Sequence, residues 1–431
     1  MDCNKTPFYS SHLLRCKRLH RNKSLTLRNK HMIKILSCSL ICCFILFFNQ
    51  QAFGETKLVK AEPKQFHVMI FSPSTQDNKF WRNVISFAQA AADDLHIQLS
   101  INYSDIINRK LYLQRVEQAL AVPEEQRPDA IIAVSYRKVT KKILSLSHYY
   151  NVPVIMVNNS LPEEDSSFIG PPRSRYKTYL GHITPNEQNS GYLLANYLIK
   201  QASLSSPEQR VTVAGIGGSR EAPESLSRYN GLMMAVSENN SSLTQMVFSN
   251  WEGDIAYKQA SSLLRRYDPL HIIWCASDLL AINTQKAINE HSRTVITGGI
   301  DWTKAGVQAV LDGELSASVG GHFANTGFAV ILLHDYLHGK DFADVMPLML
   351  ITESKLLTQD NAKQYAKHLL AQDWSSIDFK SYSRVYKPEN TSYDFSINYL
   401  FSLLEKEQKL PHNKKKQSHY TYTHLSKTTQ H

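Results

Sequence analysis

Phe66-His-Val-Met-Ile-Phe-Ser72 opens the stretch that decides the fold, because its pattern recurs along the chain. The run precedes an amphipathic, helix-like stretch at residues 80–96. Strands that read as continuous apolar runs and alternate with helices are typical of a parallel sheet covered on both faces. The later members of the series are the runs Ile97-Gln-Leu-Ser-Ile-Asn102, Ala130-Ile-Ile-Ala-Val134 and Val152-Pro-Val-Ile-Met-Val157, with helical patterns at 108–121 and 138–149.

The same alternation restarts after a stretch rich in glycine, proline and arginine, Gly170-Pro-Pro-Arg-Ser-Arg175. We therefore predict an α/β protein with two Rossmann-like lobes, each a parallel sheet with helices on both faces. Ligands of such sheets lie outside the carboxyl ends of the strands, so two facing lobes predict a cleft between them. The second series has strand-like runs at 211–216, 245–248, 272–276 and 295–298, and helical patterns at 186–201, 228–239, 255–267, 279–291 and 304–311.

The end of the chain departs from this alternation. Residues 374–379 and 382–399 are rich in aromatic side chains, and a helical pattern follows at 399–409. We interpret them as a C-terminal extension that packs on a lobe. Residues 409–431 are polar and rich in Lys, His and Thr, which predicts a disordered tail. The histidines of this tail lack the spacing of a metal site, and we predict neither a metal site nor a cofactor.

The first 54 residues have the three parts of a secretory signal peptide. Residues 1–34 carry nine Lys or Arg, an apolar run follows at 35–48, and Ala52-Phe-Gly54 supplies a small-x-small cleavage site. The apolar run is short for a membrane-spanning helix, although an uncleaved anchor is the alternative. We predict cleavage after Gly54 and export to the periplasm. Because Met32 would open a compact signal peptide by itself, residues 1–31 reflect either a long leader or a misplaced start codon.

Charge and cysteine content agree with export. The formal charge is +10, but residues 55–431 hold 39 basic and 37 acidic residues, and five of these lysines lie in the tail. The basic balance therefore belongs to the leader and the tail, which does not indicate a nucleic-acid partner. Five of the six cysteines precede residue 55, so Cys275 remains alone and no intramolecular disulfide is expected.

Polar and aromatic residues follow the expected strands. Carboxylates, Asn amides and an Arg give directional hydrogen bonds, and aromatic faces stack on the C–H faces of a sugar ring, so this mixture is typical of a polyol site. The candidates are Asn78, Phe80, Trp81, Asn158, Asn159, Arg228, Ser277, Asp301, Trp302 and His322.

Several of these candidates have structural alternatives. Asn78 and Ser277 precede expected helices and are suited to N-caps. Phe80 and Trp81 are adjacent helical residues that face different directions, so one of them is expected in the core. Arg228 has the alternative of a surface ion pair. Trp251 and Trp274 are assigned to core or interlobe packing.

Common enzyme motifs are absent from the sequence. It contains no G-x-S-x-G, H-E-x-x-H or G-x-x-x-x-G-K-[ST], and Gly215-Ile-Gly-Gly218 lacks the G-x-G-x-x-G spacing of a dinucleotide site. We therefore expect a binding protein without catalytic residues. A hydrolase that uses the cleft is the remote alternative.

The strand-end motifs, in their order and spacing, resemble the type I periplasmic binding proteins typified by ribose-binding protein. The resemblance runs from about residue 66 to 357. It rests on Asn78-Lys-Phe-Trp81, Arg228-Tyr-Asn-Gly231, Ala276-Ser-Asp278 and Gly299-Ile-Asp301.

The resemblance implies a role for each candidate residue. Asn78 would hydrogen-bond the ligand, Phe80 and Trp81 would line or stack on it, and Arg228 and Asp301 would bind hydroxyls from the second lobe. Ser277 stands where the family usually has Asn, and His322 where it often has a closing Gln. The remaining candidates are Asn158 and Asn159, which replace an Asp-Arg pair of many sugar binders, and Trp302, which is similar to a pocket Trp of autoinducer-binding receptors.

The resemblance also implies a hinge of three crossings, near 181–185, 319–323 and 348–352. The first lobe would then be 66–182 with 322–348, and the second 183–320 with 350–408, including the extension. Ligand would close the lobes, and a membrane partner would read the closed shape. We expect a monomer that delivers a sugar to an ABC permease; the alternative is a receptor for a membrane kinase or cyclase. Export and a missing helix-turn-helix exclude a repressor of this fold.

Overall fold

The first sheet contains six parallel strands, in a computed structural model that describes residues 64–104, 108–205 and 209–408. The strand order is β11-β5-β4-β3-β1-β2. Alternate residues of β3 enter the core on opposite faces: Ile132 packs with helices on one face and Ile131 with helices on the other. The strands are β1 (His67–Phe71), β2 (Gln98–Asn102), β3 (Ala130–Val134), β4 (Val154–Val157), β5 (Tyr179–Pro185) and β11 (Met349–Thr352).

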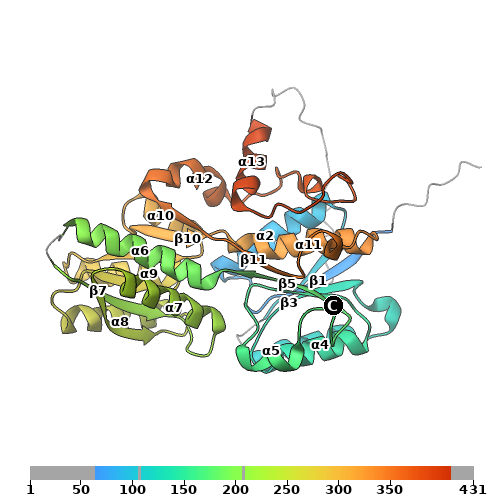
Figure 1. The fold of residues 1–431 in the computed structure, drawn as a ribbon, viewed down its shortest axis with the longest axis horizontal. Coiled ribbons are helices and arrows are strands. Elements are labelled where there is room, and N and C mark those ends of the chain that lie inside the picture. The colour runs from blue at the N-terminus through green and yellow to red at the C-terminus, as the bar shows by residue number, and fades with distance from the viewer. Residues whose placement is uncertain (1–63, 105–107, 206–208, 409–431) are drawn as a thin grey trace, which may run out of the picture. The chain divides into compact units, whose positions relative to one another are not determined.

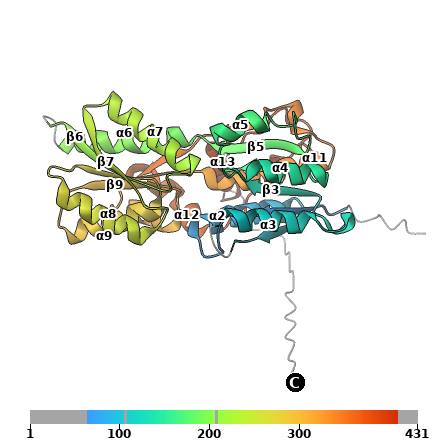
Figure 2. The same cartoon turned by 90° about the horizontal axis from the view of Figure 1, so that it is seen from below.

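Helices cover both faces of this sheet. Helices α2 (Lys79–Asp94) and α11 (Asn325–Leu337) pack together on one face (Figure 1). The other face is covered by α3 (Arg109–Leu120), α4 (Thr140–Tyr149) and α5 (Glu163–Ile169), which lie side by side in Figure 2. The continuous apolar runs of the sequence are explained by this burial on two sides.

The second sheet repeats the arrangement in the order β12-β10-β9-β8-β6-β7. Figure 2 shows α6 and α7 on one side of it and α8 and α9 on the other. The strands are β6 (Val211–Gly217), β7 (Ser241–Phe248), β8 (Ile272–Cys275), β9 (Ile296–Ile300), β10 (Ala317–Gly320) and β12 (Lys355–Thr358). The helices are α6 (Glu187–Ser205), α7 (Pro223–Glu238), α8 (Gly253–Arg266), α9 (Asp278–Glu290), α10 (Lys304–Leu311) and α12 (Gln359–Ala371).

One strand breaks the parallel pattern of the second sheet. β12 pairs antiparallel with β10, whereas the other pairs are parallel. Only Glu353 and Ser354 separate β11 in the first sheet from β12 in the second. The chain therefore enters β12 directly from the first sheet. The predicted two-lobed α/β fold is thus confirmed, with one antiparallel edge strand.

The chain passes between the two sheets three times. It leaves the first sheet after β5, returns through the short helix η2 (His322–Ala324) after β10, and passes from β11 straight into β12. Ser190 of α6 donates a hydrogen bond to Ser354 at 2.9 Å, which ties the third crossing to the start of the second lobe. The three connecting segments therefore lie close to the residues that follow β9 and β10.

The C-terminal extension, residues 372–408, contacts both lobes. Its α13 (Ile397–Gln408) places Phe401 against Tyr365 of α12, with ring centroids 4.6 Å apart. Residues 374–395 instead cover α2 and α11. There Trp374 stacks on Phe323 at 4.9 Å and donates to the side-chain oxygen of Asn83 at 3.0 Å.

This finding corrects the expected assignment of residues 350–408 to the second lobe alone. The face that α2 and α11 turn away from the first sheet is apolar, and the aromatic residues of the extension bury it. Phe395, for example, stacks on Phe328 of α11 at 4.3 Å. The extension therefore completes the first lobe before α13 returns to the second.

The predicted signal peptide at 1–54 and the predicted tail at 409–431 lie outside the described residues. Within the described part of the chain, no helix has both the length and the apolar character that crossing a membrane requires.

Candidate functional site

A cavity of about 400 Å³ lies at the ends of strands from both sheets. Its volume is within the range of small-molecule sites. Most of its lining residues come from the loops that follow β1, β3, β4, β6, β7 and β9, as expected of open α/β sheets. The lining residues include Phe80, Trp81, Arg109, Tyr136, Arg137, Asn158, Asn159, Glu187, Glu221, Glu224, Arg228, Trp251, Asp301 and His322.

Seven of the ten predicted site residues line this cavity, and three do not. Those in the lining are Phe80, Trp81, Asn158, Asn159, Arg228, Asp301 and His322. Asn78, Ser277 and Trp302 are held in other contacts.

The aromatic wall of the cavity begins at the first turn of α2. Phe80 and Trp81 are both half-buried and lie edge to face, with ring centroids 5.5 Å apart. Neither side chain is fully buried in the core, although one of them was expected there. Asn78 is the N-cap of this helix, and its side-chain oxygen accepts from the backbone N–H of Trp81 at 3.1 Å. Asn78 thus fixes the aromatic pair and does not itself line the cavity, because a capping side chain points back at its own helix.

Asn158 and Asn159 follow β4 at the floor of the cavity. Asn158 has φ = 65°, a left-handed conformation that Asn tolerates better than most residues. Its side-chain oxygen is buried and has no hydrogen-bond partner among the described residues. The Asn159 amide donates to the Ser135 carbonyl at 3.2 Å. Asn158 is therefore the member of the pair that is left to bind a ligand.

His182 supports the turn formed by Asn158 and Asn159 through a hydrogen bond. Its Nε2 donates to the Asn159 carbonyl at 2.8 Å, so its Nδ1 accepts from the Tyr179 hydroxyl at 2.9 Å. Burial lowers the pKa of His182 to about 4, although the bond to Asn159 opposes the shift. The ring is neutral at physiological pH and serves to position Asn159.

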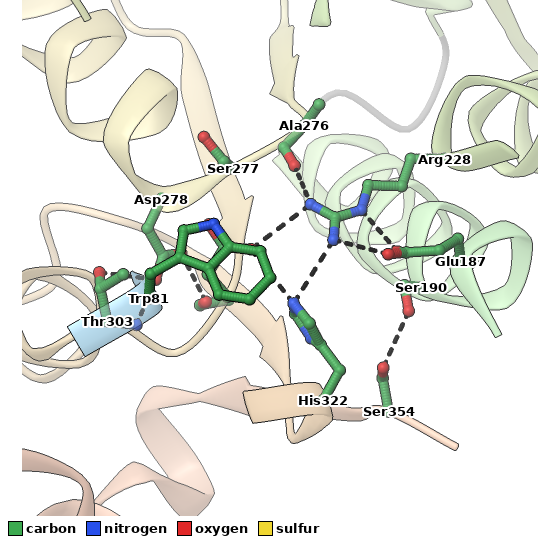
Figure 3. A network of polar contacts seen from close by, with 12 residues as sticks. Trp81, Glu187, Ser190, Arg228, Ala276, Ser277, Asp278, Thr303, His322 and Ser354 are labelled. Atoms are coloured by element: carbon green, nitrogen blue, oxygen red, sulfur yellow. Dashed lines mark hydrogen bonds and ion pairs between the residues drawn. The ribbon is translucent and has the colours of Figure 1, made fainter. Parts of the chain in front are cut away.

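Arg228 is buried on α7, and its five N–H groups all have protein acceptors. Nε and Nη2 form a two-pronged pair with Glu187 at 2.6 and 3.0 Å, and Nη1 donates to the Ala276 carbonyl at 2.7 Å. Nη1 also reaches Asp301 at 3.4 Å, and Nη2 reaches Nε2 of His322 at 3.5 Å. Figure 3 shows this network, with Glu187 and His322 at its two ends.

Two glycines allow the close approach of helices α6 and α7 that brings Glu187 to Arg228. A Cβ added at Gly191 would lie 2.0 Å from the Arg228 carbonyl oxygen, and one added at Gly231 would lie 2.0 Å from the Gln188 carbonyl oxygen. Any side chain at either position would force the helices apart.

Asp301 and Trp302 leave β9 in opposite directions. Their φ angles are 135° and 56°, so two left-handed residues turn the chain sharply. Asp301 lines the cavity, 3.4 Å from Nε2 of His322. Burial raises the pKa of Asp301 to about 7, against the lowering effect of Arg228.

Trp302 does not enter the cavity, which corrects the expectation from autoinducer receptors. Its ring is fully buried, donates to the Ser318 carbonyl at 3.2 Å and stacks on Tyr365 of α12 at 6.3 Å. The sharp turn and the apolar cover supplied by α12 and α13 hold Trp302 in the second lobe.

Ser277 is the N-cap of α9, and its hydroxyl accepts from the Leu280 N–H at 3.4 Å. The next residue, Asp278, accepts from the backbone N–H of Thr303 at 2.8 Å and from the Ser318 hydroxyl at 2.6 Å. These bonds fasten the turn that carries Asp301. Ser277 and Asp278 therefore support the site without lining the cavity.

His322 is 4 % exposed and faces Phe80, with ring centroids 4.9 Å apart. Burial lowers its pKa to about 4, although Glu187 opposes the shift, so the ring is neutral. Its Nδ1 is buried without a hydrogen-bond partner among the described residues. Nε2 of His322 thus contacts the Arg228 guanidinium, and Nδ1 is left for a ligand.

Lining residues that were not among the predicted site residues include Trp251, Glu224, Tyr136 and Glu187. Trp251 lines the cavity, with the Arg228 guanidinium 5.9 Å above its ring, although it was assigned to packing. Glu224 lies in the first turn of α7, and Tyr136 follows β3. The strand-end rule that found Asn158 also applies to Tyr136. No local motif marks Glu187, which begins a helix after the first crossing.

The residues that the structure describes contain no group of three or more His, Cys, Asp or Glu positioned to hold a metal ion. The cavity instead combines aromatic faces with buried hydrogen-bonding atoms from both lobes. Such a site can hold a small polar molecule that has one apolar face.

The fold and the cavity define the class of two-lobed proteins that bind a small ligand between α/β lobes. The family model described as "Periplasmic binding protein domain" matches residues 69–341, and the chain belongs to this family. A search of curated protein sequences found no match.

Solved structures support the same fold. A periplasmic sugar-binding protein from Pseudomonas fluorescens has a TM-score of 0.69 and 26% identity, over 78% of this chain and 99% of that one. A periplasmic solute-binding protein of an ABC transporter from Actinobacillus succinogenes, with bound D-allose, has a TM-score of 0.61 and 16% identity, over 70% of this chain and 100% of that one.

A third relative is the binding-protein component of the arabinose ABC transporter from Shewanella sp. ANA-3, bound to L-arabinofuranose. It has a TM-score of 0.60 and 17% identity, over 71% of this chain and 96% of that one. Family and neighbours are binding proteins rather than enzymes.

Proposed function

We propose that this chain is an exported periplasmic solute-binding protein that captures a small carbohydrate-like ligand between its lobes and delivers it to an ABC importer. The main support for this proposal is that one cavity combines aromatic faces with polar atoms that have no hydrogen-bond partner among the described residues. Phe80, Trp81 and Trp251 supply the faces. The polar atoms are Oδ1 of Asn158, Oε2 of Glu224 and Nδ1 of His322.

These groups fit a sugar for two physical reasons. A buried hydrogen-bonding atom without a partner costs about 1–3 kcal/mol, a cost that a ligand hydroxyl removes. The C–H face of a sugar ring buries apolar area against an aromatic ring. Hydroxyls and an apolar face on one small molecule would therefore satisfy both halves of the cavity.

The positions of these groups support hinge closure. Asn158 and Phe80 belong to the first lobe, whereas Asp301 and Glu224 belong to the second. A ligand that binds both sets favours the arrangement in which the lobes are close. The three connecting segments are the hinge in this proposal, and the closed form is the one that the importer reads.

Export is tested by expressing the full-length chain in a Gram-negative host and fractionating the cells. We expect a periplasmic protein whose mature N-terminus, determined by mass spectrometry, is Glu55. An uncleaved protein in the membrane fraction would contradict the signal peptide and favour an anchor.

Binding is tested by thermal denaturation of the exported protein against a panel of pentoses, hexoses, furanoses and amino sugars. A ligand present at a hundred times its Kd adds about 2.7 kcal/mol to the free energy of unfolding and raises the Tm. If no sugar raises the Tm, the carbohydrate proposal is wrong.

The site itself is tested with Asp301→Asn, and Asp344→Asn is the matched control on an exposed side chain of the first lobe. Removal of a hydrogen bond to a charged group lowers affinity by about tenfold to a hundredfold. We expect that loss for Asp301→Asn and unchanged affinity for the control. Equal binding by both variants would show that the ligand lies elsewhere.

A further inference from the structure

The charges around the cavity indicate which class of sugar the site takes, an inference that rests on the proposed function. Arg228 is the buried cation of the lining, and each of its N–H groups already has a protein acceptor. Its charge is balanced by Glu187 at 2.6 Å. Arg228 therefore has no N–H left for a ligand, although the family resemblance implies that it binds hydroxyls.

The other cations of the lining are also paired. Arg109 pairs with Glu221 at 2.7 Å, and Arg137 pairs with Glu164, with all four side chains substantially exposed. Among the residues that the structure describes, no lysine lines the cavity. The cationic side chains of the lining are thus matched by carboxylates of this chain.

The cavity has two further carboxyl groups that do not belong to these ion pairs with arginine. Asp301 shares Arg228 at 3.4 Å with the much closer Glu187. Glu224 has one carboxyl oxygen, Oε2, that is buried and has no hydrogen-bond partner among the described residues. The Glu224 side chain lines the cavity, so this oxygen is available to a ligand.

Burial of an unpaired carboxylate is costly, and the group responds by holding its proton or by finding a cation. Burial, with a smaller contribution from Glu187, raises the pKa of Glu224 to about 7, against the lowering effects of a hydrogen bond from its own backbone N–H and of Arg228. A cation beside Glu224 would restore the ionised form. The aromatic face of Trp81 is also a favourable surrounding for a cation, whereas the Trp251 ring already faces the Arg228 guanidinium at 5.9 Å.

We propose that the ligand is an amino sugar whose protonated amine pairs with Glu224, while its ring contacts the aromatic residues and its hydroxyls meet Asn158, Asp301 and His322. The supporting geometry is the unpartnered oxygen of Glu224 beside a cavity whose cations are already paired. The ring requirement distinguishes this ligand from a simple amine, and the amine distinguishes it from a neutral sugar.

Affinity for matched pairs of sugars tests the proposal. Isothermal titration calorimetry compares glucosamine with glucose and galactosamine with galactose, and the N-acetyl derivatives control for bulk without charge. We expect the amine form of one pair to bind about tenfold to a hundredfold more tightly than its hydroxyl and N-acetyl forms. Ethanolamine, which has the amine without the ring, should bind more weakly than the amino sugar.

The variant Glu224→Gln assigns the preference to one residue. It keeps the shape of the side chain and removes the charge, so we expect it to bind the amine and hydroxyl forms with similar affinity. Glu238→Gln is the control, because Glu238 is exposed at the other end of the same helix. We expect the control to keep the preference for the amine.

Proton release provides a second measurement. Glu224 faces Glu187 on α6, Arg228 on α7 and Tyr136 of the first lobe, whereas Asp301 faces Arg228, His322 and Asp278. Pairing with an amine favours the ionised form of Glu224. At about pH 6, below the pKa of about 7, binding of the amino sugar should therefore release a proton, visible as a dependence of the calorimetric heat on the buffer. Glu224→Gln should lose most of this release.

The outcomes separate this proposal from the proposed function. Neutral sugars that bind as tightly as their amino forms would overturn the amino-sugar assignment and leave the sugar-binding proposal standing. A preference that survives in Glu224→Gln would overturn the pairing of the amine with Glu224. Ethanolamine binding as tightly as the amino sugar would overturn the ring requirement. Failure of every sugar would overturn both.

Discussion

The buried Arg228 side chain connects three segments of the second lobe that support the cavity. It connects α6 through Glu187, the end of β8 through the Ala276 carbonyl, and the turn after β9 through Asp301. Because the side chain is buried, each of these contacts is worth more than its counterpart on the surface. This guanidinium group, together with the Asp278 hydrogen bonds that fasten the turn after β9, positions Asp301 in the cavity.

We therefore expect Arg228→Met to destabilise the protein by about 3–5 kcal/mol, because it leaves the Glu187 carboxylate buried without its partner. The double variant Arg228→Met/Glu187→Gln should recover part of the loss. Urea unfolding measures both, and Arg265→Met, at an exposed position of α8, is the control. An unchanged urea midpoint in Arg228→Met would show that the network contributes little.

His182 makes the stability depend on pH in a defined direction. In the folded protein burial lowers its pKa to about 4, whereas in the unfolded chain it binds a proton near pH 6.5. Between these values the unfolded state holds more protons, so the free energy of unfolding falls as the pH falls from 6.5 to 4. Burial lowers the pKa of His322 in the same way and adds to the effect.

His182→Gln should remove its share of this dependence. We expect the free energy of unfolding of the variant, measured by urea at several pH values, to fall less steeply below pH 6.5 than that of the parent. Curves of equal slope would contradict the assignment of a neutral, buried His182.

At the scale of elements, the apolar runs predicted eight of the twelve described strands. Strands β5, β10, β11 and β12 were not predicted as strands, and the resemblance marked only hinge crossings near them. The side chains at the strand ends were harder to interpret, because the type of a residue does not show which other residue it contacts in the fold. Asn78 and Ser277 are caps, a role that sequence allowed but could not choose. The pairing of Arg228 with Glu187 spans 41 residues and depends on two glycine contacts between helices. The positive φ angles of Asp301 and Trp302 turn the Trp302 side chain away from the cavity, and no local sequence pattern predicts these angles.

The C-terminal extension offers a test at the same scale. Trp374 is buried between Phe87 and Phe323, and its ring N–H donates to Oδ1 of Asn83. We expect Trp374→Ala to cost about 3–5 kcal/mol of stability. Trp374→Phe should cost less, because it keeps the aromatic packing and loses the hydrogen bond.

Urea denaturation measures this pair of variants, and Tyr149→Ala, which truncates a side chain that is 79% exposed on α4, is the control. If Trp374→Ala unfolds at the same urea concentration as the control, the extension is not part of the first lobe's stable core.

At the scale of the whole molecule, an ion pair joins the two lobes at the edge of the cavity. Arg109 of α3 donates to Glu221 beyond β6 at 2.7 Å, and both side chains are substantially exposed. An exposed pair contributes about 0.2–1 kcal/mol, and salt screens it. We expect Glu221→Gln to weaken ligand binding by no more than about fivefold at low salt.

The same titration in about 1 M salt should abolish the difference between parent and variant. Glu290→Gln, at an exposed position on α9, is the control. A loss that persists at high salt would mean that Glu221 binds the ligand directly and is not a link between lobes.

The extension also has a consequence for the order in which the lobes can be completed. A chain is synthesised from its N-terminus, and domains generally fold as units in that order. Here the first lobe takes α11 and β11 from residues beyond 320 and its aromatic cover from residues 374–395. Until those residues arrive, Phe87 has neither Phe328 nor Trp374 against it. The first lobe is thus completed only after β12 and α12 of the second lobe have been made.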